Sequence, residues 1–168
     1  MVLYSSNSIF NSDMQTLVCT TNTVGAMGAG VARQFRNKYP DILERYRIAL
    51  SSGKHGVGSP ALFKYHNAPW VLLVATKRDW RNDSEECYIK ESIAKLTEDK
   101  LRGFGVTSIG TTIWGCGNGG LDVGRIHEIM YNHFSKFNMP VTFFMKHDDI
   151  VKYRGPDADI TFEDTGHF

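Results

Sequence analysis

The chain has 168 residues, of which 42% are hydrophobic and 22% charged, which suits the core of one soluble domain. Its formal net charge of +1 gives no long-range attraction to nucleic acid or to a membrane, so contacts with such partners would depend on local basic sites. The three widely spaced cysteines argue against a disulfide framework and favour a reducing cytoplasm. The first ten residues lack the pattern of a signal peptide and the longest apolar run is only 70–75, so we expect a cytoplasmic protein that does not contact membranes.

The first half of the chain alternates between strand and helix patterns. Residues 17–19 predict a short buried strand, and a helix is expected after the glycine-rich segment that follows, with Val31, Ala32 and Phe35 at helical spacing. Pro40 can begin the next helix, whose inner face would consist of Ile42, Leu43, Tyr46 and Leu50. Residues 51–59 indicate a loop, and the apolar run 70–75 is typical of a central strand covered on both faces.

The second half continues the alternation. Asp83 and Glu86 predict a capping box at the start of a helix with an apolar stripe formed by Ile89, Ile93 and Leu96. Val106, Ile109 and Ile113 indicate a further strand. An amphipathic helix is predicted from Asp122, and residues 141–144 predict the last strand. Strands that alternate with helices predict a three-layer α/β/α fold around a mixed, mainly parallel sheet.

Ligands of such sheets bind in the loops after the carboxyl ends of the strands. The first of these loops, residues 22–30, has the sequence NTVGAMGAG and leads into a helix. Its glycines allow a close approach of the backbone, and the start of the helix offers free N–H groups to an anion. The glycine spacing and the missing Lys-Ser/Thr pair differ from those of Rossmann and Walker loops. A glycine-rich turn without a ligand is the alternative.

A second glycine loop, residues 115–122, has the sequence GCGNGGLD and also lies between a strand and a helix. Its glycines suit a cradle of backbone amides for a diphosphate. We interpret Cys116 as a small packing residue and not as a nucleophile, because no basic partner is evident. Asp122 could carry a proton, but we favour its role as a helix cap.

The third loop, residues 76–81, has the sequence TKRDWR and follows the most buried strand. Lys77 could act there as a nucleophile or as a fixed positive charge. Arg78, Trp80 and Arg81 could hold nucleic acid through phosphate contacts and base stacking, whereas Asp79 is a weaker acid/base candidate. A solvated loop with one half-buried tryptophan is the alternative.

Together these residues resemble a macro domain. The stretch LVCTTNTVGAMGAGVARQFRNKYPDILERY resembles the segment in which an asparagine precedes a G-x-M-G-x-G loop and a helix. ATKRDWR and GCGNGGLD are similar to the branch that holds the DarG-type DNA ADP-ribosyl glycohydrolase antitoxins and the human terminal ADP-ribose glycohydrolase. The resemblance covers residues 1–145, which we expect to form the macro domain, followed by a polar extension, residues 146–168, of unknown structure.

The resemblance implies an ADP-ribose site without a cofactor. Lys77 and Asn22 would be catalytic, with Asn22 on the distal ribose. The residues implied to bind ADP-ribose are Ser8 and Ile9 beside the adenine, Asn22, Gly28, Ala29, Gly30 and Val31 on one side of the diphosphate, and Cys116, Gly117, Asn118, Gly119, Gly120 and Leu121 on the other. The human member pairs its lysine with an aspartate, and the position that matches this aspartate is Gly119. The GCGxGGLD pattern favours the antitoxin type.

Three functions remain open at this point. The first is hydrolysis of ADP-ribose from DNA or from acidic protein side chains, the second is non-catalytic reading of ADP-ribose, and the third is a phosphatase or deacetylase that acts on ADP-ribose 1″-phosphate or O-acetyl-ADP-ribose. We expect a monomer, and no metal site, because the six histidines do not cluster and His127 and His133 lie six residues apart on one predicted helix.

Overall fold

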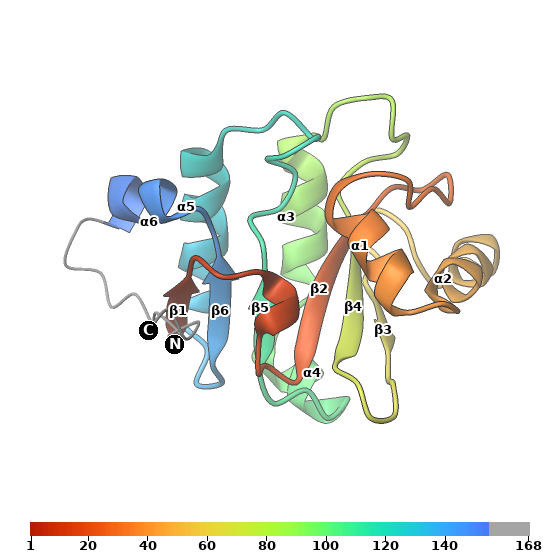
Figure 1. The fold of residues 1–168 in the computed structure, drawn as a ribbon, viewed down its shortest axis with the longest axis horizontal. Helices are drawn as coiled ribbons and strands as arrows, with labels where there is room; N and C mark the ends of the chain where they lie inside the picture. Colours follow the sequence, from red (N-terminus) through yellow and green to blue (C-terminus); the bar gives the residue numbers. More distant parts are fainter. Residues whose placement is uncertain (155–168) are drawn as a thin grey trace.

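The computed structural model of the chain describes residues 1–154 and contains one six-stranded sheet (Figure 1). All neighbouring strands in it are parallel except β3 and β4, which are antiparallel. The strand order is β1 (Val2–Ser5), β6 (Val141–Phe144), β5 (Ile109–Thr111), β2 (Thr16–Thr21), β4 (Trp70–Ala75) and β3 (Ala61–Phe63). The prediction of a mixed, mainly parallel sheet is therefore confirmed.

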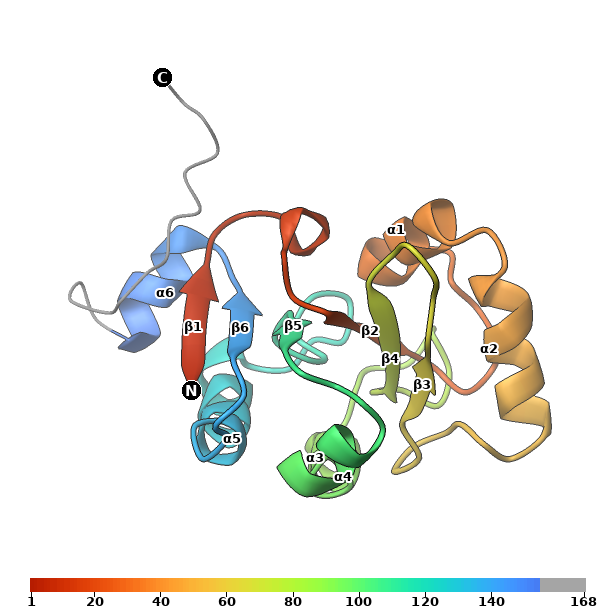
Figure 2. The same cartoon turned by 90° about the horizontal axis from the view of Figure 1, so that it is seen from below.

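Helices cover both faces of this sheet. One face carries α1 (Gly30–Lys38) and α2 (Ile42–Ser51), and the other carries α3 (Glu86–Ala94), α4 (Glu98–Gly103) and α5 (Val123–Phe134), as seen from below in Figure 2. A 3-10 helix, η1 (Ile9–Asn11), follows β1. The predicted three-layer α/β/α arrangement is thus confirmed.

Alternation along β4 explains why two separate cores form. Leu72 and Val74 belong to the hydrophobic cluster that contains residues of α3, α4 and α5, whereas Val71 and Leu73 belong to the cluster that contains residues of α1 and α2. Successive side chains of a strand point to opposite faces, so an unbroken apolar run is needed to fill both layers.

Two sequence predictions about element boundaries were wrong. Val106 was expected in the strand but lies before β5, because its N–H donates to Leu101 O and completes the turn that ends α4. Ile113 was also expected in the strand but lies beyond it, because the chain turns away after Thr111. Asp83 does not cap α3. The cap residue is Glu85, which makes no side-chain cap bond, because the N–H of Ser84 is held by Gly119 O and keeps this segment extended.

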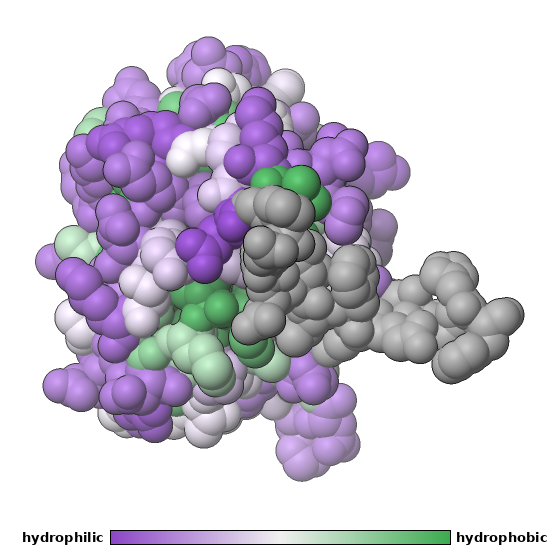
Figure 3. Space-filling view, turned by 90° about the vertical axis from the view of Figure 1, so that its left-hand side faces the viewer, coloured by the Kyte–Doolittle hydropathy of each residue, from purple (hydrophilic) through white to green (hydrophobic). Residues whose placement is uncertain are grey.

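The predicted cap of α5 is confirmed, since a carboxylate oxygen of Asp122 accepts from Arg125 N at 2.9 Å. After β6 the chain forms α6 (His147–Arg154), which packs on α5 and buries Ile150 in the larger core cluster. Figure 3 shows this side of the molecule as mostly hydrophilic, with hydrophobic residues gathered in one area. The rest of the predicted polar extension, residues 155–168, lies outside the described residues. Within residues 1–154, no helix combines the length and apolar character that membrane crossing requires.

Candidate functional site

Three loops that follow β2, β4 and β5 meet at one end of the sheet. We call them the asparagine loop (residues 22–30), the lysine loop (76–81) and the glycine loop (115–121). The first two are joined through the carbonyl oxygen of Arg78, which accepts from the N–H and the hydroxyl of Thr23 at 2.9 and 2.8 Å. Lys77 Nζ donates to Asn118 O at 2.8 Å and so joins the lysine loop to the glycine loop. Parallel strands place their carboxyl ends at the same edge, which is why segments far apart in sequence converge.

The side chain of Asn22 shapes the asparagine loop from within. Its Oδ1 accepts from the N–H groups of Val24, Gly25 and Ala26 at 3.1 to 3.2 Å, and its Nδ2 donates to Ala26 O at 2.9 Å. These bonds use the amide oxygen fully and leave one Nδ2 hydrogen for another partner. Any contact of the Asn22 side chain with a ribose therefore has to be made as a donor.

Two buried side chains lie behind this loop, and no sequence pattern assigned them to the site. The Tyr46 hydroxyl donates to the backbone oxygen of Asn22 and lies 2.8 Å from its Oδ1, and burial raises the pKa of this phenol. Behind it, His55 Nδ1 lies 2.8 Å from Ser59 O and its Nε2 lies 2.7 Å from the hydroxyl of Thr21. A carbonyl only accepts, so Nδ1 carries the proton and Nε2 accepts from Thr21. Burial lowers the pKa of His55, which fits a neutral ring.

The asparagine loop ends at an open helix start. Ala29 is the cap residue of α1 and makes no side-chain cap bond, so the first N–H groups of the helix have no side-chain acceptor. Gly30 adopts a φ of +58°, and residues 28–30 are exposed. A Cβ at Gly30 would lie 3.2 Å from Asn118 Nδ2, which shows how closely the glycine loop approaches the helix start. This end of α1 can accept an anion.

The glycine loop is closed so tightly that Gly119 cannot carry a side chain. A Cβ there would lie 2.2 Å from Gly115 O and 2.5 Å from the Ser84 hydroxyl oxygen. Leu121 N donates back to Gly115 O at 3.0 Å, which draws the two ends of the loop together. Gly119, which the resemblance places where the human member has an aspartate, thus has no room for a side chain in this chain.

Asp83 lies beside this loop, although the sequence analysis placed it in a helix cap. Its nearest carboxylate oxygen would be 3.3 Å from a Cβ at Gly120. Asp83 follows the lysine loop by only two residues, and this proximity could have marked it as a candidate site residue. The neighbouring Ser84 N donates to Gly119 O at 2.9 Å, which brings Asp83 close to the glycine loop.

The Cys116 thiol is half-buried and donates to Trp114 O at 3.4 Å. Burial, and then the negative charges of Asp122 and Asp149, raise the pKa of this thiol to about 12. It is therefore protonated at neutral pH, which supports its interpretation as a packing residue.

The outer part of the lysine loop is exposed and positively charged. Arg81 pairs with Asp79 at 2.6 Å, and hydrogen bonds from Arg81 lower the pKa of Asp79 to about 2, so this carboxylate is a poor proton donor at neutral pH. The Arg78 guanidinium lies 5.4 Å from the centre of the Tyr88 ring, and the Trp80 side chain is 59% exposed. The exposed Trp80 ring can therefore stack on a planar group of a ligand.

The predicted adenine-side residues have other local roles. Ser8 caps η1 by accepting from Phe10 N at 3.3 Å, and Ile9 is buried in the core cluster of α1 and α2.

The side chain of His127 hydrogen-bonds with the Tyr4 hydroxyl at 2.8 Å, and that of His133 with Leu96 O at 2.7 Å. Across residues 1–154 there is no group of three or more histidines, cysteines and carboxylates suited to a metal ion.

The model of the macro domain family matches residues 18–130, which span β2 to the middle of α5 and include all three loops. The chain belongs to the macro domain family.

Curated relatives of this macro domain point to one branch. It is 28% identical, over 91% of its length and 43% of the relative's, to a DNA ADP-ribosyl transferase–DNA ADP-ribosyl glycohydrolase fusion protein of Thermosipho africanus. It is 32% identical, over 72% of its length and 34% of the relative's, to the DNA ADP-ribosyl glycohydrolase of Thermus aquaticus. The chain thus spans less than half of the length of either relative.

Solved structures agree with this placement. The DarTG protein of Thermosipho africanus in complex with ADP-ribose is 28% identical, with a TM-score of 0.79 over 86% of this chain and 42% of that chain. The macrodomain of Mycobacterium tuberculosis DarG is 27% identical, with a TM-score of 0.79 over 86% of this chain and 98% of that chain. The resemblance to the DarG branch that the three loops suggested is thereby confirmed.

Proposed function

We propose that this macro domain binds ADP-ribose between its three loops and hydrolyses the bond that joins ADP-ribose to DNA, with Lys77 at the reacting centre. One observation carries the proposal: Lys77 Nζ is held at 2.8 Å from Asn118 O, on the glycine loop that also closes over the start of α1. The names of the relatives, which are DNA ADP-ribosyl glycohydrolases, support the reaction type.

The diphosphate is the part of the ligand that the backbone suits best. The start of α1, with Gly28, Ala29, Gly30 and Val31, offers N–H groups that have no side-chain acceptor. The glycine loop from Cys116 to Leu121 would cover the opposite side of the diphosphate with further backbone amides. Fixing the diphosphate in this way orients the distal ribose, so that binding energy far from the reacting bond contributes to catalysis.

Lys77 can assist the reaction in two ways. Hydrolysis breaks the bond from ribose C1″ to the modified base and forms a bond from C1″ to water, through positive charge on the ring. An unprotonated Lys77 could attack C1″, whereas a protonated one could stabilise the departing base. We favour the second role, because a departing base needs a donor and the bond to Asn118 O holds Nζ in place to act as one. Asn22, with its remaining Nδ2 hydrogen, would donate to the distal ribose.

The DNA would lie against the outer part of the lysine loop. Trp80 is exposed and can stack on a base, while Arg78 and Arg81 can contact phosphates. The chain has a net charge of only +1, so these local contacts would supply most of the electrostatic affinity.

A non-catalytic reader is the second candidate. It is favoured by the closed geometry at Gly119, which excludes the aspartate that the human relative pairs with its lysine. A reader would bind ADP-ribose tightly and release none from any substrate.

The test measures release of ADP-ribose from ADP-ribosylated single-stranded DNA and from glutamate-ADP-ribosylated protein. Wild type, Lys77→Ala and the control Lys136→Ala, an exposed lysine after α5, are compared at equal concentration. We expect release from DNA that is lost in Lys77→Ala and kept in the control. Release from neither substrate, together with micromolar binding of ADP-ribose, would establish the reader instead.

A further inference from the structure

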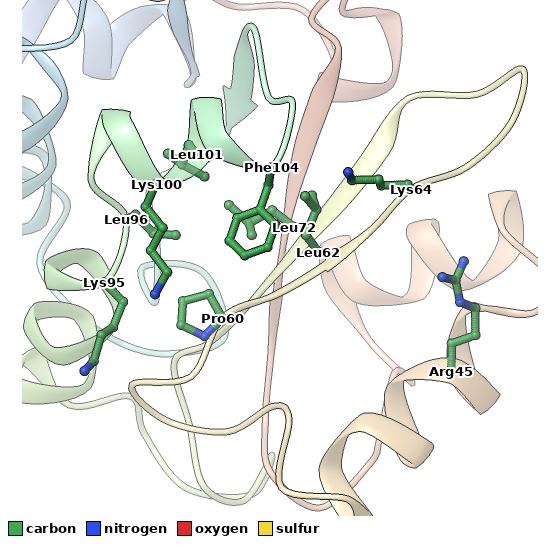
Figure 4. Close-up of a pocket in the computed structure, with 10 residues that line it drawn as sticks. All are labelled: Arg45, Pro60, Leu62, Lys64, Leu72, Lys95, Leu96, Lys100, Leu101 and Phe104. Atoms are coloured by element: carbon green, nitrogen blue, oxygen red, sulfur yellow. The ribbon is translucent and has the colours of Figure 1, made fainter.

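A cavity of about 500 Å³ lies beside the edge strand β3 (Figure 4), and none of the residues that line it belongs to the three loops. It opens between β3, the end of α3 and the short helix α4. Its apolar lining consists of Pro60, Leu62, Leu72, Leu96, Leu101 and Phe104. We call it the β3 cavity.

The cavity exists because two neighbouring elements are short. β3 has three residues and α4 has six, so this corner of the sheet is not covered as the centre is. Leu72, Leu96 and Leu101 form a floor that is at most 4% exposed, whereas Phe104 above it is 53% exposed. An aromatic ring left this open beside a buried apolar floor is unusual for a surface that only meets water.

Four cations surround the β3 cavity, and none of the carboxylates within residues 1–154 lines it. They are Arg45, Lys64, Lys95 and Lys100. Arg45 lies over the rings of Phe63 and Tyr65 at 4.5 and 4.9 Å, and Lys64 lies 4.8 Å from the centre of the Trp70 ring. Within residues 1–154, none of the four forms a salt bridge, although other arginines and lysines of the chain do. A net charge of only +1 makes this a local excess of positive charge.

We propose that the β3 cavity binds a single-chain anionic amphiphile, with its hydrocarbon chain on the leucine floor and its carboxylate or phosphate head beside Lys95 and Lys100. The volume lies within the range of small-ligand pockets, roughly 300–1,000 Å³, which are mainly apolar with a few polar groups at defined points. A nucleotide does not fit this lining, because its polar groups would face leucines. The site is separate from the ADP-ribose site and does not depend on the proposed function.

Isothermal titration of the whole chain with dodecanoate and with dodecyl phosphate, both below their critical micelle concentrations, tests this proposal. We expect one bound molecule per chain for at least one of them, and the head group that binds more tightly identifies a fatty acid or an alkyl phosphate as the source. Dodecyltrimethylammonium, which has the same chain and a cationic head, should bind at least tenfold more weakly, because four cations surround the opening.

Three variants test whether the ligand binds in the β3 cavity. The double variant Lys95→Gln/Lys100→Gln should weaken binding by roughly fivefold to tenfold, since each exposed ion pair contributes little. Leu62→Asn should weaken it because it places a polar group in the apolar lining. The matched control Lys136→Gln/Lys146→Gln, with the same loss of charge elsewhere, should not weaken it. Binding of ADP-ribose should be unchanged in all three variants, so failure here is distinct from failure of the proposed function.

Four results would overturn the proposal: no binding of either anion, equal binding of the cationic amphiphile, equal affinity in the double lysine variant, or association only with phosphatidylglycerol vesicles. The last result would assign the cations to a membrane surface and leave the cavity without a ligand.

Discussion

At the carboxyl ends of β2, β4 and β5 the chain presents backbone N–H groups and side chains that other parts of the protein hold in place. Beside β3 it presents leucines and cations that have no acidic partner within residues 1–154. Asn22 makes four bonds to its own loop, and Gly119 is packed against Gly115 and Ser84. Lys95 and Lys100, by contrast, are exposed. A polar, geometrically demanding ligand needs the first kind of site, and an apolar ligand with a charged head tolerates the second.

A substitution that fills the space at Gly119 should have the largest effect of the changes considered for the ADP-ribose site. Gly119→Ala should force the glycine loop open, cost about 1–3 kcal/mol of stability through overpacking, and weaken ADP-ribose binding by at least roughly tenfold. Gly56→Ala is the control, because a Cβ there meets nothing within 4 Å and Gly56 lies outside the three loops. Calorimetric affinities and denaturant unfolding of both variants check this, and equal affinity in the two would refute the account of the glycine loop.

Removing the Tyr46 hydroxyl should have an intermediate effect. Tyr46→Phe leaves the buried carbonyl of Asn22 without this donor, which should cost about 1–3 kcal/mol of stability and weaken ADP-ribose binding severalfold. Tyr39→Phe removes a comparable bond, to Pro69 O at 2.9 Å, on the same face of the sheet but away from the loops. It should lower stability without a change in affinity. If both variants bind ADP-ribose like wild type, the asparagine loop does not need Tyr46.

A change of pH should have the smallest effect. Burial lowers the pKa of His55 and of His127 below the ordinary value of 6.5, so the unfolded chain binds protons that the folded chain excludes. Their contribution to stability is complete above about pH 6.5 and is lost as the pH falls below it. In urea unfolding at pH 7.5 and 5.5, His55→Gln should therefore lose less stability on acidification than wild type. The exposed His66→Gln should behave like wild type, and an unchanged pH dependence in His55→Gln would contradict the assignment of a neutral ring.

Much of the fold followed from local sequence patterns. The run 70–75 predicted β4 because both of its faces are buried, and Asp122 predicted the start of α5 because a cap depends on residues that are close in sequence. Val106 and Asp83 misled the prediction because distant partners decided their conformation: Leu101 O takes the N–H of Val106, and Gly119 O takes that of Ser84.

The three loops of the site could be predicted from the sequence, but the buried side chains behind them could not. The glycines and Lys77 stand out in sequence because a turn, a close approach or a charge at a strand end has a local signature. Tyr46 and His55 have none, since the groups they hold, Asn22 and Thr21, lie 24 and 34 residues away. The β3 cavity also has no such signature, because its lining comes from α2, β4 and α4, from β3 and the residues beside it, and from the turns after α3 and α4.

The central claim is that Lys77 acts on ADP-ribose bound between the three loops. Single-turnover release of ADP-ribose from ADP-ribosylated single-stranded DNA tests it most directly, with the affinity for free ADP-ribose measured on the same samples. We predict that Lys77→Ala lowers the release rate by at least roughly a hundredfold while its affinity for ADP-ribose changes by less than about threefold, because in the proposed binding mode backbone groups hold the diphosphate. Release by Lys77→Ala at the wild-type rate would contradict the claim.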